Sequence, residues 1–293
     1  MHRVMNVPET FSLEATCAPV DWGRGRWPNE DWIDGALVWL GWEGDLVVHR
    51  RVRTGAHDRE LIVEGDADPA SDYAWAESRL GINQSMPSLG DPVIARIAAD
   101  YPGLRPHASG SLFAGLADSI IGQSITVKAA AVVSARIASH FHPGRELYGR
   151  VFWPTPRPDD LADADTSRLR RTGLTWKRAE ALVAAGQAAR NGELPEPTHQ
   201  SIEDLRAMLL RLPLVGRWTA ESALLWGIGE ADAFPMGDVA LLRAAKKAYG
   251  EPEMTMRDLE ARSREWSGHR AWASRLLWID LFGAARPSAG IPA

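Results

Sequence analysis

The sequence contains a single cysteine, Cys17, among 293 residues. One cysteine excludes an intramolecular disulfide and any zinc or iron–sulfur site built on four cysteines. Long hydrophobic runs are also missing, because no apolar stretch reaches the roughly 18 residues that cross a membrane. The N-terminus lacks the charged-then-apolar pattern of a signal peptide. We therefore expect a cytoplasmic protein without a membrane partner, able to bury a sizeable core with 45% hydrophobic residues.

An excess of basic charge is missing as well. Lys and Arg number 33 against 38 Asp and Glu, which gives a net charge of −5. Contact with nucleic acid would therefore need a local basic patch rather than a basic coat. Acids are frequent between Asp31 and Glu77, whereas basic residues gather between Arg168 and Lys247. This asymmetry allows DNA binding by the second half, although about half of these basic residues also fit solvated helix faces paired with acids.

Two helical segments flank a tight turn in the second half of the chain. Ser201 caps a predicted helix that Pro213 ends, and a second helix is predicted from Trp218 to Ile228, with Gly227 and Gly229 at its end. A Gly in such a turn, here Gly216, lets successive backbone N–H groups face outward toward a phosphate oxygen. Residues 201–228 are therefore predicted to form a DNA-binding helix–hairpin–helix.

A Pro/Gly loop at residues 234–239 follows the hairpin and contains Asp238, and a third helix is predicted from about Val239 to Ala248. An Asp at this position is a favoured helix cap, and local sequence alone favours that role. A carboxylate held beside a sugar can also stabilise the positive charge that develops when a glycosidic bond breaks. The two roles are compatible in one residue.

The hairpin and the Asp loop together resemble the helix–hairpin–helix DNA glycosylases of the 3-methyladenine DNA glycosylase II (AlkA) type. In order and spacing, the resemblance covers roughly Gly110 to Phe282 and takes in four further motifs. These motifs are Ile120-Ile-Gly-Gln-Ser-Ile-Thr-Val-Lys-Ala129, Phe152-Trp-Pro-Thr-Pro156, Leu174-Thr-Trp-Lys-Arg-Ala-Glu-Ala-Leu182 and Asn191-Gly-Glu-Leu-Pro195.

The N-terminal part has a different pattern of residues. Short β-favouring runs separated by Gly, Asp and Pro occur at residues 11–16, 35–40, 44–52 and 60–64, and these predict an antiparallel sheet. The resemblance implies the same organisation. We expect an α+β, mostly α fold, with a small N-terminal antiparallel sheet-and-helix domain at residues 1–88. A helical glycosylase body that contains the helix–hairpin–helix motif is expected at residues 89–293.

The resemblance implies a monofunctional enzyme that flips alkylated purines out of duplex DNA and hydrolyses them, leaving an abasic site in base-excision repair. Bases such as 3-methyladenine and 7-methylguanine are already cationic and leave as neutral molecules with little or no acid assistance. Relatives that also cleave the strand carry a nucleophilic Lys where this chain has Trp218. We therefore expect water to be the nucleophile.

The resemblance also assigns the site residues. The catalytic residue is Asp238; the substrate pocket is Trp218, Trp278, Gln123 and Ser222; the DNA-binding residues are Ser124, Leu214, Gly216, Arg217, Thr219, Lys177 and Arg178. The backbone carbonyls of Leu210, Leu212 and Val215 would hold a structural Na+ or K+ ion, and no cofactor is required. The partner is damaged double-stranded DNA. The enzyme is expected to be a bacterial monomer that associates with the nucleoid when it is on DNA.

Two positions depart from the family pattern. Leu214 stands where the hairpin usually has its first Gly, and Ser124 stands where a bulky apolar side chain fills the gap left by the flipped base. The wedge is then Ile125, another loop, or absent. Two other functions stay open: a non-catalytic helix–hairpin–helix protein that binds damaged or distorted DNA, with Asp238 only a cap, and an oxidised-purine glycosylase/lyase, which the missing Lys disfavours.

Overall fold

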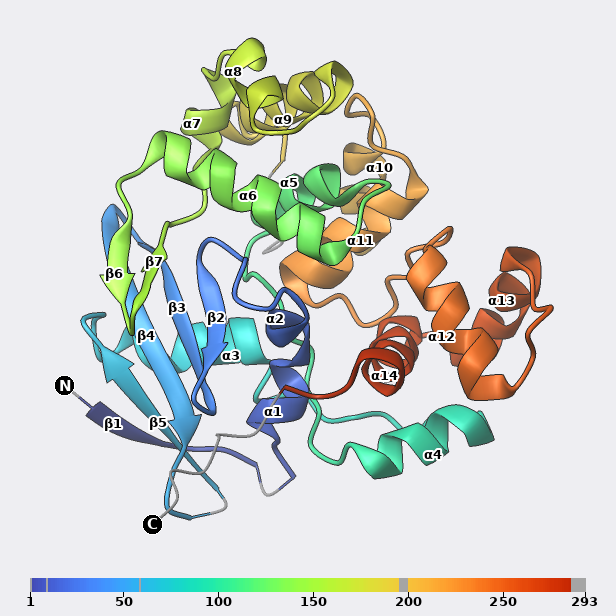
Figure 1. The fold of residues 1–293 in the computed structure, drawn as a ribbon. Coiled ribbons are helices and arrows are strands. Elements are labelled where there is room, and N and C mark those ends of the chain that lie inside the picture. The colour runs from blue at the N-terminus through green and yellow to red at the C-terminus, as the bar shows by residue number, and fades with distance from the viewer. Residues whose placement is uncertain (1, 9, 58, 195–199, 286–293) are drawn as a thin grey trace.

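The computed structural model describes residues 2–8, 10–57, 59–194 and 200–285 (Figure 1). Pro195 of the motif at residues 191–195, and residues 286–293 of the expected helical body, lie outside these described residues. An antiparallel sheet lies on one side of the molecule, and helices make up the rest. The expected α+β fold, mostly α, is therefore confirmed.

The sheet has five strands in the order β1-β5-β4-β3-β2, with every neighbouring pair antiparallel. The strands are β1 (His2–Asn6), β2 (Glu30–Ile33), β3 (Ala36–Glu43), β4 (Leu46–Thr54) and β5 (Glu60–Gly65). Strands β3, β4 and β5 confirm three of the predicted runs, whereas β1 and β2 were not predicted. Helix α3 (Ser71–Leu80) covers one face, where its Ala76 and Leu80 pack with Val52 and Val63.

The predicted strand at residues 11–16 is wrong. Ser12 caps a short helix α1 (Leu13–Thr16), because its hydroxyl accepts a hydrogen bond from the Ala15 N–H at 3.2 Å. A second short helix, α2 (Ala18–Trp22), follows directly with Pro19 in its first turn. Both features favour helix initiation over extended chain. Cys17 lies between the two helices and is fully buried.

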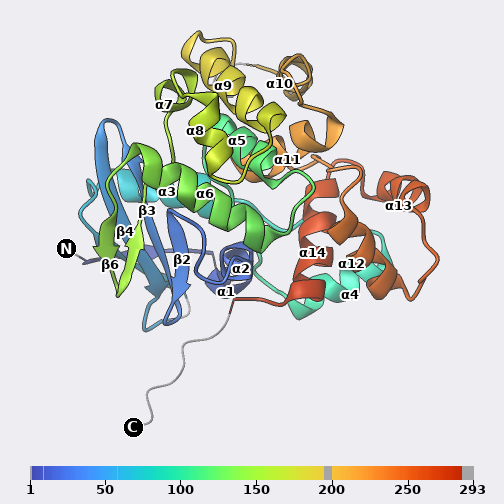
Figure 2. The same ribbon diagram turned by 45° about the horizontal axis from the view of Figure 1, so that its top comes forward.

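The helical body packs around one core in which Leu116, Leu224 and Leu277 have no exposed surface. Figure 2 shows α4 and α12 to α14 on the side away from the sheet. The helical elements of this body are α4 (Pro92–Asp100), α5 (Leu112–Gly122), α6 (Val127–Phe141), α7 (Pro158–Ala162), α8 (Thr166–Arg171), α9 (Trp176–Arg190), α10 (Ile202–Leu209), α11 (Arg217–Ile228), α12 (Val239–Tyr249), α13 (Met256–Arg262), a 3₁₀ turn (Ser263–Trp266) and α14 (Arg270–Phe282).

No single helix in the described ranges is long and apolar enough to cross a membrane. Helices α5 and α6 reach that length and composition only as a pair, and the pair is bent by 118°.

A two-stranded ribbon of β6 (Arg145–Leu147) and β7 (Arg150–Phe152) connects the two parts of the molecule. The fully buried Phe152 packs against Val38 and Leu40 of the N-terminal sheet. The Trp153 N–H also donates to the Pro28 carbonyl at 2.8 Å. A segment from the second half of the chain thus completes the packing of the first half. The division at residue 88 stays a prediction.

Helices α5 and α11 approach closely at two glycines. A Cβ added to Gly115 would lie 2.4 Å from the Cα of Gly227, and one added to Gly227 would lie 2.9 Å from the Ser111 carbonyl oxygen. Helix α11 ends at Ile228, one residue after Gly227, so this glycine lies at the predicted end; its packing against α5 was not predicted. Gly229, with a left-handed φ of 70°, ends the helix as predicted.

Replacing Gly115 with Ala should lower the free energy of unfolding by about 1–3 kcal/mol, because the neighbouring backbone of α11 must move to admit the methyl group. Gly122→Ala on the same helix is the matched control, since no atom lies within 4 Å of its added Cβ. The control should be neutral or stabilising by up to about 1 kcal/mol. Urea denaturation measures both, and equal effects would contradict the close approach.

Candidate active-site cleft

The hairpin between α10 and α11 keeps a left-handed residue, and that residue is Leu214. Its φ is 61°, a conformation that favours glycine, whereas Gly216 is extended at φ −88° and ψ −178°. The expectation that the turn depends on the conformational freedom of Gly216 is therefore wrong. A Cβ added to Gly216 would meet nothing within 4 Å. Glycine at this position leaves open space in front of the start of α11.

The first backbone N–H groups of α11 are available for a ligand. The Ala220 N–H donates to the Gly216 carbonyl, so the preceding N–H groups of Arg217, Trp218 and Thr219 lie in the first turn, before the helical ladder begins. Such a turn carries the positive end of the helix dipole and suits a phosphate oxygen. This is the geometry expected of a helix–hairpin–helix that contacts the DNA backbone.

Gln123, at the end of α5, supports this turn. Its Nε2 donates to the Leu214 carbonyl at 3.0 Å and to the Thr219 hydroxyl at 2.9 Å. Thr219 is 3% exposed, and its hydroxyl is engaged in this contact. Gln123 lines the expected pocket, but its amide is already committed to the hairpin. The bonds join α5 to the strained Leu214 turn.

Asp238 caps α12 and also contacts the hairpin helix. Its Oδ1 accepts the Leu241 N–H at 2.7 Å, and its Oδ2 accepts the Trp218 indole N–H at 3.1 Å. Two N–H donors suit an ionised carboxylate, which can only accept hydrogen bonds. The predicted cap is confirmed. The indole of Trp218 fixes the direction in which the carboxylate points.

A buried ion pair holds the loop at residues 234–239 in place. Glu221 on α11 is 5% exposed; its carboxylate accepts the Arg206 Nε–H at 2.5 Å and the Phe234 N–H at 3.0 Å. Both helices of the hairpin motif are thereby tied to the start of the loop. The position of Asp238 therefore depends on α10 and α11 together.

A cleft of about 1560 Å³ opens in front of Asp238. Its walls include one face of α5 with Ser111, Ala114, Asp118 and Gly122, and one face of α11 with Trp218, Ser222 and Trp226. The remaining lining comes from the N-terminal part, including α2 and α3, from the loop before α7, and from the starts of α6 and α12 and the end of α14. Eight of the thirteen tryptophans line the cleft: Trp22, Trp27, Trp39, Trp42, Trp75, Trp218, Trp226 and Trp278. A concave, aromatic cleft with a few polar groups is typical of a ligand site.

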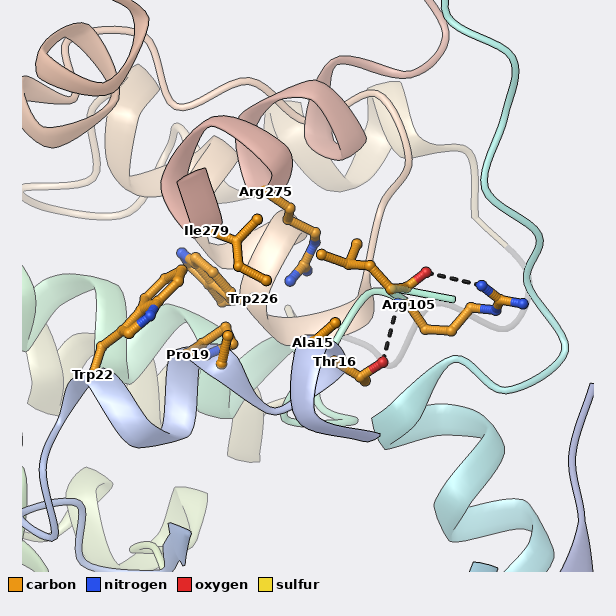
Figure 3. Close-up of a pocket in the computed structure, with 10 residues that line it drawn as sticks. Ala15, Thr16, Pro19, Trp22, Arg105, Trp226, Arg275 and Ile279 are labelled. Atoms are coloured by element: carbon orange, nitrogen blue, oxygen red, sulfur yellow. Dashed lines mark hydrogen bonds between the residues drawn. The ribbon is translucent and has the colours of Figure 1, made fainter. Parts of the chain in front are cut away.

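Two of these tryptophans pack against each other. Trp278 is 4% exposed and stacks on Trp226, with ring centroids 5.4 Å apart and an interplanar angle of 27°. Figure 3 shows Arg275 beside Trp226, where its guanidinium lies 4.6 Å from the ring centroid. Trp226 thus already contacts a cation. Most of the Trp278 ring belongs to the core.

Behind Trp226 lies a small cavity of about 10 Å³, lined also by Trp22 and Arg105 (Figure 3). Arg275 faces it with a hydrogen bond from its Nη2 to the Leu225 carbonyl at 2.8 Å. Burial lowers the pKa of Arg275 to about 9, so the side chain stays protonated at neutral pH. The cavity is too small for a base and belongs to the packing behind the cleft.

Of the other predicted DNA-binding residues, some line the cleft and others lie outside it. Ser124 is exposed at φ 56° in the turn after α5, next to Ile125, which is 37% exposed. Both line the cleft. The exposed guanidinium of Arg217 lies 3.6 Å from Glu260. Lys177 and Arg178, at the start of α9, are not brought to the cleft.

Several polar residues of the cleft were not predicted from the sequence, among them Glu30, Arg79, His107 and Asp118. The Arg79 Nη2 lies 2.5 Å from the Glu30 carboxylate, and the His107 Nε2 lies 3.4 Å from it. Burial alone would raise the pKa of Glu30, but the charges of Arg79 and His107 lower it to about 2. Asp118 is a lone acid in an otherwise apolar helix, a signal visible in the sequence.

Comparison with known proteins agrees with this geometry. Residues 117–268 match the HhH-GPD family, described as the HhH-GPD superfamily base excision DNA repair protein. The chain belongs to this superfamily. It is 31% identical over 231 residues to the DNA-3-methyladenine glycosylase 2 of Escherichia coli (strain K12), an alignment that covers 76% of this chain and 77% of the relative.

Solved structures share the fold over nearly the whole chain. The 3-methyladenine DNA glycosylase from Archaeoglobus fulgidus superimposes with a TM-score of 0.80 at 22% identity, covering 96% of this chain and 98% of that one. An 8-oxoguanine glycosylase/lyase from Clostridium acetobutylicum, in complex with DNA, reaches 0.74 at 16% identity, covering 95% and 96%. The fold alone therefore does not distinguish a hydrolase from a lyase.

The cap and the charge of Asp238 can be separated by two substitutions. Asp238→Ala should destabilise the protein by about 1 kcal/mol more than Asp238→Asn, because Asn keeps a cap for the Leu241 N–H and Ala does not. Thermal unfolding of the two variants beside the wild type measures this difference. Equal unfolding free energies would show that the cap contributes nothing to stability.

Proposed function

We propose that the protein is a monofunctional DNA glycosylase that removes alkylated purines of the 3-methyladenine and 7-methylguanine type and leaves an abasic site. The observation that carries the proposal is the carboxylate of Asp238, held at the mouth of an aromatic cleft by the Trp218 indole and the start of α12. Damaged double-stranded DNA is the proposed substrate. The proposed enzyme is a monomer of the bacterial cytoplasm, associated with the nucleoid on DNA.

The hairpin supports a contact with the phosphate backbone of one DNA strand. Such a contact does not depend on the base sequence. The open space at Gly216 and the first-turn N–H groups of α11 accommodate a phosphate oxygen without reading sequence. Ile125, exposed at the rim of the cleft, is an apolar side chain that suits the gap left by a flipped base. The flipped nucleotide then enters the cleft with its sugar beside Asp238.

The proposed chemistry is hydrolysis with one carboxylate near the sugar. The bond between the anomeric carbon and the base nitrogen breaks, and its electron pair leaves with the base. Positive charge develops on the sugar, which the fixed negative charge of Asp238 stabilises without reorganising. Water adds to the anomeric carbon and gives up a proton, for which the Asp238 carboxylate is an acceptor. A cationic alkylated base takes the electron pair and leaves neutral.

Trp218 supports hydrolysis rather than strand cleavage. A lyase step needs an amine that attacks the sugar and forms a Schiff base, and an indole cannot do this. Lys128 also lines the cleft. It lies in the first turn of α6, after the exposed Ser124 turn, and therefore belongs to a different element from the hairpin. We place it at the rim, where it suits a phosphate.

We also propose that the carbonyls of Leu210, Leu212 and Val215 hold a structural Na+ or K+. Backbone carbonyl oxygens are hard ligands that suit such ions. The three residues lie in the short turn between α10 and α11, and the Leu212 carbonyl accepts the Val215 N–H at 3.2 Å. This bond curls the turn and leaves the second lone pair of that oxygen available. The ion would stiffen the turn, and the chemistry needs no cofactor.

Asp238→Asn should reduce the release of 7-methylguanine from methylated duplex DNA at least about 100-fold, because the neutral amide cannot stabilise the sugar cation. Chromatography of the released base measures the rate, and anisotropy should show retained DNA binding. Strand breaks should appear in the wild-type product only after alkali. Breaks before alkali, together with trapping of the protein by borohydride, would favour a glycosylase/lyase instead.

The same experiment tests the non-catalytic alternative. If neither protein releases a base while both bind abasic duplex DNA, Asp238 is only a helix cap and the chain is a binder of damaged DNA. Substantial activity of the Asp238→Asn protein would remove this residue from the catalytic assignment.

Gly216→Val should weaken binding to duplexes of unrelated sequence alike, by about 10-fold to 100-fold, because the new side chain occupies the space before α11. Gly90→Val is the matched control, since Gly90 is exposed, has no neighbour within 4 Å of an added Cβ, and is not part of the hairpin. Fluorescence anisotropy measures both affinities. Loss of affinity for one sequence only would argue against a phosphate contact.

A further inference from the structure

The packing of α5 against α11 determines which residues face each other across the cleft. Gly115 lies against Gly227 near the end of α11. Gln123, at the end of α5, contacts Thr219 at the start of α11. The two helices therefore run antiparallel between these contacts. That register places Asp118 level with Leu224, between Ser222 and Trp226.

Asp118 lies further along the α5–α11 wall of the cleft than the contact between Trp218 and Asp238. The register puts it six residues beyond Trp218 along α11, roughly 9 Å at the helical rise. Trp218 is the residue whose indole binds Asp238, and both acids line the same cleft. If the sugar of a flipped nucleotide lies beside Asp238, a base that extends along this wall is directed toward Asp118.

The surroundings of Asp118 differ from those of Asp238. Asp118 is half-buried, and none of the described residues forms a hydrogen bond or ion pair with it. Burial is the main cause that raises the pKa of Asp118 to about 7, and the negative charge of Glu30 adds to it. The positive charge of Arg79 acts in the opposite direction. His107 is buried, and burial lowers its pKa. Asp118 is thus an acid that still carries a proton near neutral pH, with no partner committed to it.

We propose that Asp118 is a second catalytic carboxyl, which protonates the departing base when that base is a neutral purine. The proposal concerns the role of Asp118 in the release of neutral purines, and it rests on the proposed glycosylase function. Neutral bases are poor leaving groups because the electron pair of the broken bond stays on an unprotonated ring. Two carboxyl groups in different environments can divide the tasks of acid and charge stabiliser.

The proton and electron balance is complete with water as the only co-reactant. As the glycosidic bond breaks, its electron pair passes to the purine, and the Asp118 carboxyl gives its proton to a ring nitrogen. Water adds to the anomeric carbon and loses a proton to the Asp238 carboxylate. Asp118 regains a proton from solvent and Asp238 releases one. The products are free base and an abasic site.

The test compares one neutral and one cationic substrate in otherwise identical duplexes, hypoxanthine and 7-methylguanine. In Asp118→Asn, the ratio of hypoxanthine release to 7-methylguanine release should fall about 100-fold, because the amide has no acidic proton to give. Asp118→Glu should recover part of this ratio. Asp100→Asn, an exposed acid on α4 away from the cleft, is the matched control and should leave the ratio as in the wild type.

The pH dependence separates catalysis from a structural role. In the wild type, hypoxanthine release should fall as pH rises through about 7, since the acid form of Asp118 is lost there. Release of 7-methylguanine should lack this limb. In Asp118→Asn, the limb near pH 7 should disappear from the hypoxanthine profile. If the limb persists in this variant, protonation of the base itself causes it and the proposal is overturned.

The remaining outcomes distinguish a failure of the acid role of Asp118 from a failure of the proposed glycosylase function. An unchanged ratio in Asp118→Asn, or a wild type that releases 7-methylguanine but no hypoxanthine, overturns the acid role and leaves the proposed function intact. Release of neither base by the wild type overturns both. If Asp118→Asn does not fold by circular dichroism, the ratio in Asp118→Glu and the wild-type pH profiles decide in its place.

Discussion

The close approach of α5 and α11 at Gly115 and Gly227 is the constraint on which the rest of the site depends. With no side chain between the helices, their backbones meet and their register cannot slip. This register brings Gln123 within hydrogen-bond reach of the hairpin and sets Trp218 on the wall shared with α5. The hairpin turn and one wall of the cleft thus depend on the same helix pair, and a shift at the glycines would displace both.

Asp238 shows how a local rule and a functional requirement can be met by the same atoms. The helix N-terminus needs an acceptor, the proposed chemistry needs a fixed negative charge in the cleft, and the carboxylate has one oxygen for each of its two N–H donors. The strain at Leu214 is of a different kind. A left-handed non-glycine residue costs roughly 1–2 kcal/mol, and the Gln123 amide, bonded to the Leu214 carbonyl, helps to hold that conformation.

The sequence predicted what is local and missed what depends on distant contacts. Ser201, Asp238 and Gly229 act within a few residues of themselves, so caps and helix ends of the hairpin region were predictable. The packing role of Gly227 was missed because its reason for being glycine is α5, more than a hundred residues away. Polar residues in the N-terminal wall of the cleft, such as Glu30 and Arg79, were missed for the same reason. Asp118 was missed as well, although a single acid in an apolar helix is visible without the fold.

The charge distribution favours a particular way of holding DNA. The protein is acidic overall, and its cleft contains both acids, among them Glu30 and Asp238, and cations, among them Lys128, Arg157 and Arg243. A contact between the hairpin and the DNA backbone needs donors that bring no competing anion. The N–H dipoles at the start of α11 meet this need better than Arg217, whose charge is shared with Glu260. The proposed phosphate contact at the hairpin is therefore compatible with the acidic charge of the whole protein.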